Sequence, residues 1–321
     1  MLAALILSVL AAESIALPGG PPVGIDYLVA DLAHGRIWVP AGNTGNVDVV
    51  DIATGKVTPI GGFPTAPPRR PGRPNMGPSS VTVGDGVVWI GNRGDSTACS
   101  IDERTLTRGT CRKLPSMPDG VAYVSARREV WVTTPRDRTI TVVPVPGPEP
   151  AKPASIKLDG DPEGLAVDQA LGFFYTNLED HDRTVAIDTR TRRVKASFPT
   201  GCGADGPRGL ALDAERHLLF AACTHGAVVL DLAHDGKQVG RIQTGHGVDN
   251  IDYAPKPGLL LIASGADGML TFARVEKDGA LNKLLATPTA PGARCVVAGP
   301  DGTGYVADSA GGRLIVVRPP Q

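Results

Sequence analysis

Six charged residues recur at one position of a repeated pattern, two residues before a short apolar run. They are Asp26, Asp119, Glu163, Arg208, Asp249 and Arg294. Carboxylate and guanidinium groups that meet at one opening could bind a polar or zwitterionic ligand through charge-assisted hydrogen bonds. Carboxylates with neighbouring amides could instead hold a hard divalent cation. Which chemistry is possible depends on the elements that carry these residues.

The pattern is a repeat with a period of roughly forty residues. Its clearest copy begins at Asp161, with an apolar run ending at Asp168, a second strand ending in Tyr175–Asn177, a third closing on Ile187–Asp188 and a fourth over Val194–Phe198. Seven apolar runs open the seven copies: Leu28–Asp31, Val81–Gly84, Val121–Val124, Leu165–Asp168, Leu210–Asp213, Ile251–Ala254 and Val296–Gly299. Four short strands per unit at this period are typical of a β-propeller. We therefore predict an all-β, seven-bladed β-propeller.

The two ends of the chain complement each other. The seventh unit stops at Pro319–Gln321, directly after its third strand, while Glu13–Leu17 reads as a strand without a blade. Because a propeller must protect its sheet edges, we predict that the N-terminal strand completes blade seven. Residues 13–321 then form one domain. Residues 1–12 are apolar, end in small residues and resemble a truncated secretory signal segment.

Composition agrees with this fold and excludes some partners. The chain has 32 Lys and Arg against 33 Asp and Glu, and only 4% aromatic residues. Neither nucleic acid nor a membrane surface is indicated by such a neutral, aromatic-poor chain. Trp38, Trp89 and Trp131 share one register in the second strand of their units, which predicts a place in the core between blades.

The five cysteines favour disulfides over a metal site. Cys99 and Cys111 flank a turn symmetrically, and Cys202 and Cys223 belong to loops that we expect on one face, so each pair could form a bridge. No C-x-x-C pair occurs and no histidine has a ligand-like spacing to a cysteine. Cys295, on the innermost strand of blade seven, is expected to be a buried free thiol. The bridges predict a periplasmic or secreted protein.

In a propeller, the loops before the first strand and after the second share one rim of a central channel. The predicted ligand-binding residues on this rim are Asp26, Asn92, Asp119, Glu163, Asn177, Arg208, Asp249, Asn250 and Arg294. We expect Glu163 to pair with Arg208 of the adjacent blade. A pure scaffold is an alternative, using blade edges and the arginine-rich segment Phe63–Met76.

Catalysis is the less favoured hypothesis. The chain has no G-x-S-x-G, H-E-x-x-H or P-loop motif, so we assign no catalytic residue and expect no cofactor. His181, His225 and His246 fall in rim-side loops and could act as acid or base. An enzyme alternative is a lactonase-like hydrolase or lyase that holds Ca²⁺ or Mg²⁺ through Glu163, Asn177, Asn250 and Asp308.

Tyr175–Asn177 and the units around it resemble the YVTN repeat of bacterial β-propellers. Leu17–Lys56 resembles the first blade of exported YncE-like proteins. Segments of later blades resemble the same proteins: GNRGDSTACSIDERTL in blade two, the Cys202/Cys223 frame around GPRGLALD, and GVDNIDY with IASGADGMLTF in blade six. The resemblance covers nearly the whole chain and implies a periplasmic or secreted binding protein. A more distant likeness to gluconolactonase-type propellers underlies the Ca²⁺ or Mg²⁺ alternative. Streptogramin-lyase-like propellers use a channel histidine, and no histidine stands at the inner-ring positions.

Together these patterns predict an exported, monomeric binding module without catalysis. Its partner would be a small polar ligand or a protein, bound at the channel mouth. No membrane span is expected, since the apolar stretch Leu2–Ala12 is too short to cross a bilayer.

Overall fold

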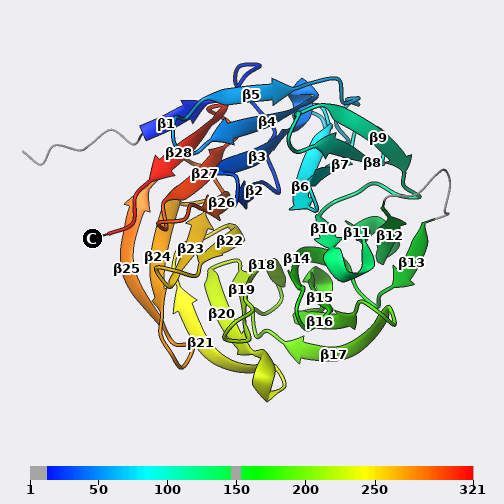
Figure 1. Cartoon of the computed structure of the whole chain (residues 1–321). Coiled ribbons are helices and arrows are strands. Elements are labelled where there is room, and N and C mark those ends of the chain that lie inside the picture. Colours follow the sequence, from blue (N-terminus) through cyan, green and yellow to red (C-terminus); the bar gives the residue numbers. More distant parts are fainter. Residues whose placement is uncertain (1–12, 146–152, 321) are drawn as a thin grey trace, which may run out of the picture.

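The computed structural model describes residues 13–145 and 153–320, so the predicted signal segment lies outside the described residues. Seven four-stranded antiparallel sheets are arranged in a ring around a central channel (Figure 1). The predicted seven-bladed β-propeller is therefore confirmed. Within the described part of the chain, no helix is long and apolar enough to cross a membrane.

Each blade runs from an innermost strand outward, and consecutive strands pair with each other. Blade one contains β2 (Val29–Asp31), β3 (Arg36–Ala41), β4 (Asn46–Asp51) and β5 (Val57–Ile60). Blade two contains β6 (Pro78–Gly84), β7 (Val87–Asn92), β8 (Thr97–Asp102) and β9 (Arg108–Lys113). Blade three contains β10 (Val121–Val124), β11 (Glu129–Thr134), β12 (Thr139–Pro144) and β13 (Ala154–Lys157). Blade four contains β14 (Pro162–Asp168), β15 (Phe173–Leu178), β16 (Arg183–Asp188) and β17 (Arg193–Pro199). Blade five contains β18 (Pro207–Asp213), β19 (Leu218–Cys223), β20 (Gly226–Asp231) and β21 (Lys237–Gln243). Blade six contains β22 (Val248–Ala254), β23 (Leu259–Ser264), β24 (Met269–Val275) and β25 (Leu281–Pro288). Short 3-10 helices lie at η1 (Gly42–Thr44), η2 (Ser125–Arg127), η3 (Pro135–Asp137), η4 (Glu179–His181) and η5 (Leu232–His234).

Blade seven joins the two ends of the chain, as predicted. It contains β26 (Cys295–Ala298), β27 (Gly304–Asp308), β28 (Arg313–Val317) and the N-terminal strand β1 (Glu13–Ala16). Strand β1 pairs antiparallel with β28, with Glu13 opposite Val316 and Ala16 opposite Arg313. Figure 1 shows β1 on the outer side of β28. The ring is thereby closed by a pairing between the first and last strands of the fold.

The hydrophobic core consists of separate clusters, one at each contact between neighbouring blades. Trp38 lies in the cluster between blades one and two, Trp89 between two and three, and Trp131 between three and four. Trp38 and Trp131 are fully buried, and Trp89 is 6% exposed. The predicted role of the tryptophans in interblade packing is confirmed.

Both predicted disulfides are present. Cys99 and Cys111 face each other across the β8–β9 pair, and Cys202 is bonded to Cys223 at the end of β19. Cys295 is a buried free thiol. Two disulfides indicate an oxidising, extracellular compartment.

Each disulfide should contribute measurably to stability. The cysteines are 12 and 21 residues apart, and bridges closing such loops typically stabilise a protein by about 2–4 kcal/mol. Replacing one pair by serine should therefore lower the thermal midpoint by several degrees while the other pair is kept. Peptide mapping without reductant should find Cys295 alone alkylated after unfolding. A bridge that includes Cys295 would contradict this assignment.

Candidate functional site

The channel mouth is built by bulges in the innermost strands. The pairing register shifts between Pro162 and Leu165 in β14, and the same irregularity recurs in β18 and β22. Bulges of this kind leave residues out of the ladder and redirect their side chains. The unpaired residues are Glu163 and Gly164, Arg208 and Gly209, and Asp249 and Asn250. The fold therefore presents one charged side chain at each bulge.

Glycine follows the charged residue where neighbouring bulges touch. A Cβ atom on Gly164 would lie 2.3 Å from the carbonyl oxygen of Arg208, and one on Gly209 would lie 2.8 Å from that of Asp249. Only glycine permits this approach of one inner strand to the next. The pairs Glu163-Gly164 and Arg208-Gly209 thus bring the charges of blades four, five and six together.

Arg93 is the centre of the first ion network, and the sequence reasoning missed it. It follows β7 directly, one residue beyond the rim position that Asn92 occupies. Its Nη1 lies 2.8 Å from Asp26 Oδ2, and its Nη2 donates to Asp119 Oδ1. The signal that could have revealed it was the charge immediately after the second strand of blade two.

This network perturbs Asp119. Burial raises the pKa of Asp119 to about 6, and the negative charge of Asp26 adds to the effect, while Arg93 opposes it. One of the two carboxylate oxygens, Oδ2, is buried without a hydrogen bond. Asp119 therefore gains a proton at mildly acidic pH more readily than an ordinary aspartate.

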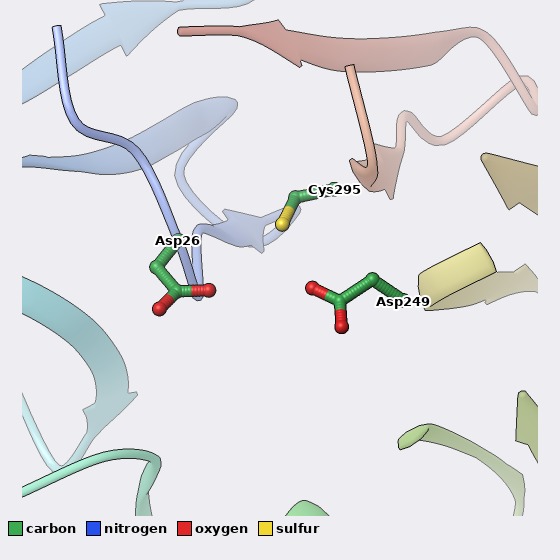
Figure 2. A group of neighbouring side chains, drawn as sticks. All are labelled: Asp26, Asp249 and Cys295. Carbon is green, nitrogen blue, oxygen red and sulfur yellow. The ribbon is translucent and has the colours of Figure 1, made fainter. Parts of the chain in front are cut away.

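The second network joins blades one, six and seven. Arg294 Nη1 lies 3.1 Å from Asp249 Oδ2, and its Nη2 lies 3.9 Å from Asp26 Oδ1. Figure 2 shows the carboxylates of Asp26 and Asp249 facing each other, with the Cys295 sulfur beside them; one donor atom of each lies within 4.8 Å of the others. Burial raises the pKa of the Cys295 thiol well above its usual value, as do Asp26 and Asp249, which keeps it protonated. Two guanidinium groups already compensate these carboxylates, so the cluster is occupied by protein cations.

Glu163 does not pair with Arg208, contrary to our expectation. Arg208 Nη1 contacts Glu179 Oε1, which lies in η4 after the second strand of blade four. The sequence reasoning did not consider Glu179, because it lies beyond the strand end. Glu163 instead accepts a hydrogen bond of 3.3 Å from the Tyr27 hydroxyl group.

Glu163 is consequently the one mouth carboxylate, among the described residues, that has no ion-pair partner. Burial raises its pKa well above the usual range, and the negative charges of Asp119 and Glu179 raise it further. An additional positive charge at this position would stabilise the ionised form. Glu163 thus marks the place where the mouth lacks a cation.

The charges around the mouth do not balance. Five carboxylates face three guanidinium groups, an excess of two negative charges when all are ionised. The eight residues are Asp26, Arg93, Asp119, Glu163, Glu179, Arg208, Asp249 and Arg294. Every blade contributes at least one of them. The inner part of the mouth is therefore net negative when these eight groups are ionised, and Arg70 and Arg73 add positive charge only along the adjoining groove.

Three of the predicted rim residues have a structural role instead. Asn92 donates to the Pro64 carbonyl oxygen at 3.0 Å, and Asn177 donates to that of Arg208 at 2.6 Å. Asp308 accepts from Arg313 Nε at 2.8 Å and from the Gly311 amide. All three are buried, because the ends of the second strands lie beneath the rim. In this structure Asn177 and Asp308 are thus held by protein groups.

The cavities connect the mouth with two other regions. A cavity of about 220 Å³ continues into the channel and is lined by Tyr27, Asn250, Asp252 and apolar residues of the inner strands. A larger groove of about 820 Å³ is lined by Arg93 and Arg294 of the mouth and also by Arg70 and Arg73. The arginine-rich segment Phe63–Met76 thus borders the mouth and does not form a separate surface.

The rim-side histidines lie outside these cavities. His225 and His246 pack edge to face with ring centroids 4.8 Å apart, and His246 Nδ1 lies 3.2 Å from Asp267 Oδ2. His181 Nδ1 lies 2.8 Å from Asp180 Oδ1. Within the described residues, no histidine lines the channel cavity or the groove.

No protein-family model matches the chain. No curated protein matches its sequence. Solved propellers match its fold: hydrazine synthase of Kuenenia stuttgartiensis has a TM-score of 0.74 at 13% identity, with 98% of this chain and 99% of that chain covered. A chain of the mitotic checkpoint complex has a TM-score of 0.74 at 14% identity, covering 100% and 97%. Virginiamycin B lyase from Staphylococcus aureus has a TM-score of 0.70 at 14% identity, covering 95% and 97%. At these identities the likeness concerns the fold alone.

Proposed function

We propose that this protein is an exported, non-catalytic binding module of the YVTN-repeat type, which takes a small cationic or zwitterionic ligand at its channel mouth. The observation that carries the proposal is the excess of carboxylates there, with Glu163 left without a cation. The two disulfides support export, and the repeat supports the family assignment. An ammonium group of the ligand would replace the missing positive charge beside Glu163.

The paired arginines explain why the site suits a small charged molecule. Asp26 and Asp119 are held by Arg93, and Asp249 is held by Arg294, so the mouth is organised before a ligand arrives. Preorganised groups lose little entropy on binding. Arg70 and Arg73, which also line the groove, would meet an anionic group of a zwitterion.

Glu163→Gln should weaken ligand binding by about ten- to a hundredfold, because a hydrogen bond to a charged group contributes about 1.5–3 kcal/mol. A panel of alkyl diamines, amino acids and betaines can be screened by thermal shift and the best probe measured by calorimetry. Glu215→Gln, an exposed carboxylate outside the mouth, is the matched control. Equal affinity for wild type and Glu163→Gln would remove Glu163 from the site, and no binding by any probe would favour a scaffold.

The affinity should also depend on pH. The pKa of Asp119 is raised to about 6, and burial raises the pKa of Glu163 and Asp249 as well. These groups become protonated as the pH falls, and the mouth then loses negative charge. Binding of the same cationic probe should therefore be weaker at pH 5 than at pH 8, with the control variant following the wild type.

A further inference from the structure

A second cluster of charged side chains lies on the face opposite the channel mouth. Asp31 ends β2, His34 lies in the β2–β3 turn, and Glu103 follows β8 in the neighbouring blade. The turns between first and second strands lie at the far end of a blade from the mouth, so this cluster is independent of the site described above. It joins blade one to blade two.

Three donor atoms converge there. His34 Nδ1 lies 3.0 Å from Asp31 Oδ2 and 2.7 Å from Glu103 Oε1, and all three donors lie within 4.8 Å of one another. The Asp31 and Glu103 side chains are only 5% and 7% exposed, whereas that of His34 is 52% exposed. The cluster is therefore a buried pair of carboxylates covered by a solvent-facing ring.

The two carboxylates of this cluster share a single imidazole. Glu103 Oε1 is buried and lies 2.7 Å from His34 Nδ1, but the hydrogen bonds of that nitrogen go to Asp31, so its contact with Glu103 lacks hydrogen-bond geometry. Burial raises the pKa of Glu103, and a side-chain hydrogen bond that the Glu103 and Asp31 carboxyl groups share adds to the effect. A single ring nitrogen cannot satisfy two carboxylates at once. Two buried carboxylates that share one imidazole are costly to ionise together, and a bound cation would remove that cost.

The equivalent position in blade five shows what the cluster lacks. There Asp213 also ends the first strand, and Arg216 stands at the same i+3 place as His34. Arg216 Nε lies 2.6 Å from Asp213 Oδ2, and its Nη1 donates to the backbone oxygen of Glu276, the counterpart of Glu103. Blade five thus fills this place with a permanent cation. Blade one has a histidine there, with Arg36 reaching only the backbone oxygen of Glu103.

We propose that Asp31, His34 and Glu103 bind a divalent zinc-class cation that links blades one and two. Imidazole nitrogen with two carboxylate oxygens is a ligand set that zinc accepts, and water would complete the coordination. Ligands of a tetrahedral zinc ion stand roughly 3.3–3.5 Å apart for bonds of about 2.0–2.2 Å. His34 Nδ1 lies 3.0 Å from Asp31 Oδ2 and 2.7 Å from Glu103 Oε1, so the ring must move outward by roughly 0.3–0.8 Å, which its exposure permits. A pocket of about 470 Å³ beside Asp31, His34 and Glu103 leaves room for the water.

The test is a zinc titration of the full chain by calorimetry at pH 7.5, after dialysis against a chelator. Wild type should bind one zinc ion, and His34→Ala and Glu103→Gln should each weaken binding at least about 100-fold, since even outer-shell changes cost about 10–100-fold.

His234→Ala is the matched control for the histidine variant. His234 Nδ1 lies 2.7 Å from Asp231 Oδ2, at the same i,i+3 spacing as His34 and Asp31. Among the described residues, however, no second carboxylate converges on His234. The zinc affinity of His234→Ala should therefore equal that of wild type.

The absorption spectrum of bound Co²⁺ distinguishes this site from one that includes the Cys295 thiol. Co²⁺ bound at Asp31, His34 and Glu103 should show only weak visible bands, without a thiolate charge-transfer band. A thiolate band that disappears in Cys295→Ser would place the ion at the channel mouth and overturn the proposal. Unchanged zinc affinity in His34→Ala, or no zinc binding by wild type, would overturn it as well.

Discussion

Deletion of residues 1–16 is expected to open the ring and to produce the largest loss of stability of any change considered for this protein. Strand β1 supplies the outer strand of blade seven, and Ile15 packs against the core between blades seven and one. About four backbone hydrogen bonds at roughly 1 kcal/mol each, together with the partly buried Ile15, suggest a loss of about 4–5 kcal/mol. The thermal midpoint should fall by on the order of 10 °C. The exposed edge of β28 should also promote aggregation.

Deletion of residues 1–12 is the matched control, because it leaves β1 intact. Scanning calorimetry and light scattering on both truncations separate the contribution of the strand from that of the preceding segment. Were the shorter and longer truncations to melt alike, β1 would contribute nothing to closure.

Replacement of Asp48 should stabilise the protein, with an effect that depends on pH. Asp48 lies in β4, is fully buried, and neither carboxylate oxygen has a hydrogen bond. Burial raises its pKa from 3.8 to about 7. The folded state therefore binds more protons than the unfolded state between these values, so stability falls as the pH rises through this window and is lowest above pH 7. A pKa raised this far corresponds to on the order of 4 kcal/mol.

The equivalent position in another blade suggests which residue can replace Asp48. Asp48 pairs with Val39, and the same register holds Val228 opposite Ala221 in blade five. Asp48→Val should be more stable than wild type at pH 8 and should gain much less at pH 4. Asp48→Asn should lose the pH dependence while keeping the shape. Urea unfolding at both pH values measures the difference, and parallel pH profiles for wild type and Asp48→Asn would refute the assignment.

Much of the fold follows from the sequence, because each blade of a propeller repeats the same pattern. The seven apolar runs, the shared register of Trp38, Trp89 and Trp131, and the symmetric placement of Cys99 and Cys111 each depend on local spacing. Closure by β1 also follows, since a missing fourth strand and an orphan strand can satisfy each other. The repeat likewise placed Asp26, Asp119, Arg208, Asp249 and Arg294 at the channel mouth.

The tertiary structure alone decided which of these charges meet. A repeat gives the position of a backbone, whereas ion pairs depend on long side chains that reach across blades. Arg93 and Glu179 enter the mouth from loops beyond the strand ends, and Glu179 takes the arginine expected for Glu163. The repeat predicts Asn92, Asn177 and Asp308 at the solvent-accessible rim, but the structure buries them under it.

On the face opposite the channel mouth, too, the partners of a side chain come from a neighbouring blade. Asp31 and His34 are three residues apart, but Glu103 lies in the next blade, so their convergence requires the closed ring. Asp48 reads as one polar residue in an apolar strand, and its lack of partners becomes visible only when blade seven covers it. The sequence by itself determined the architecture and the candidate positions. Packing between blades determined the partners, because desolvation and side-chain reach are properties of neighbours that are distant along the chain.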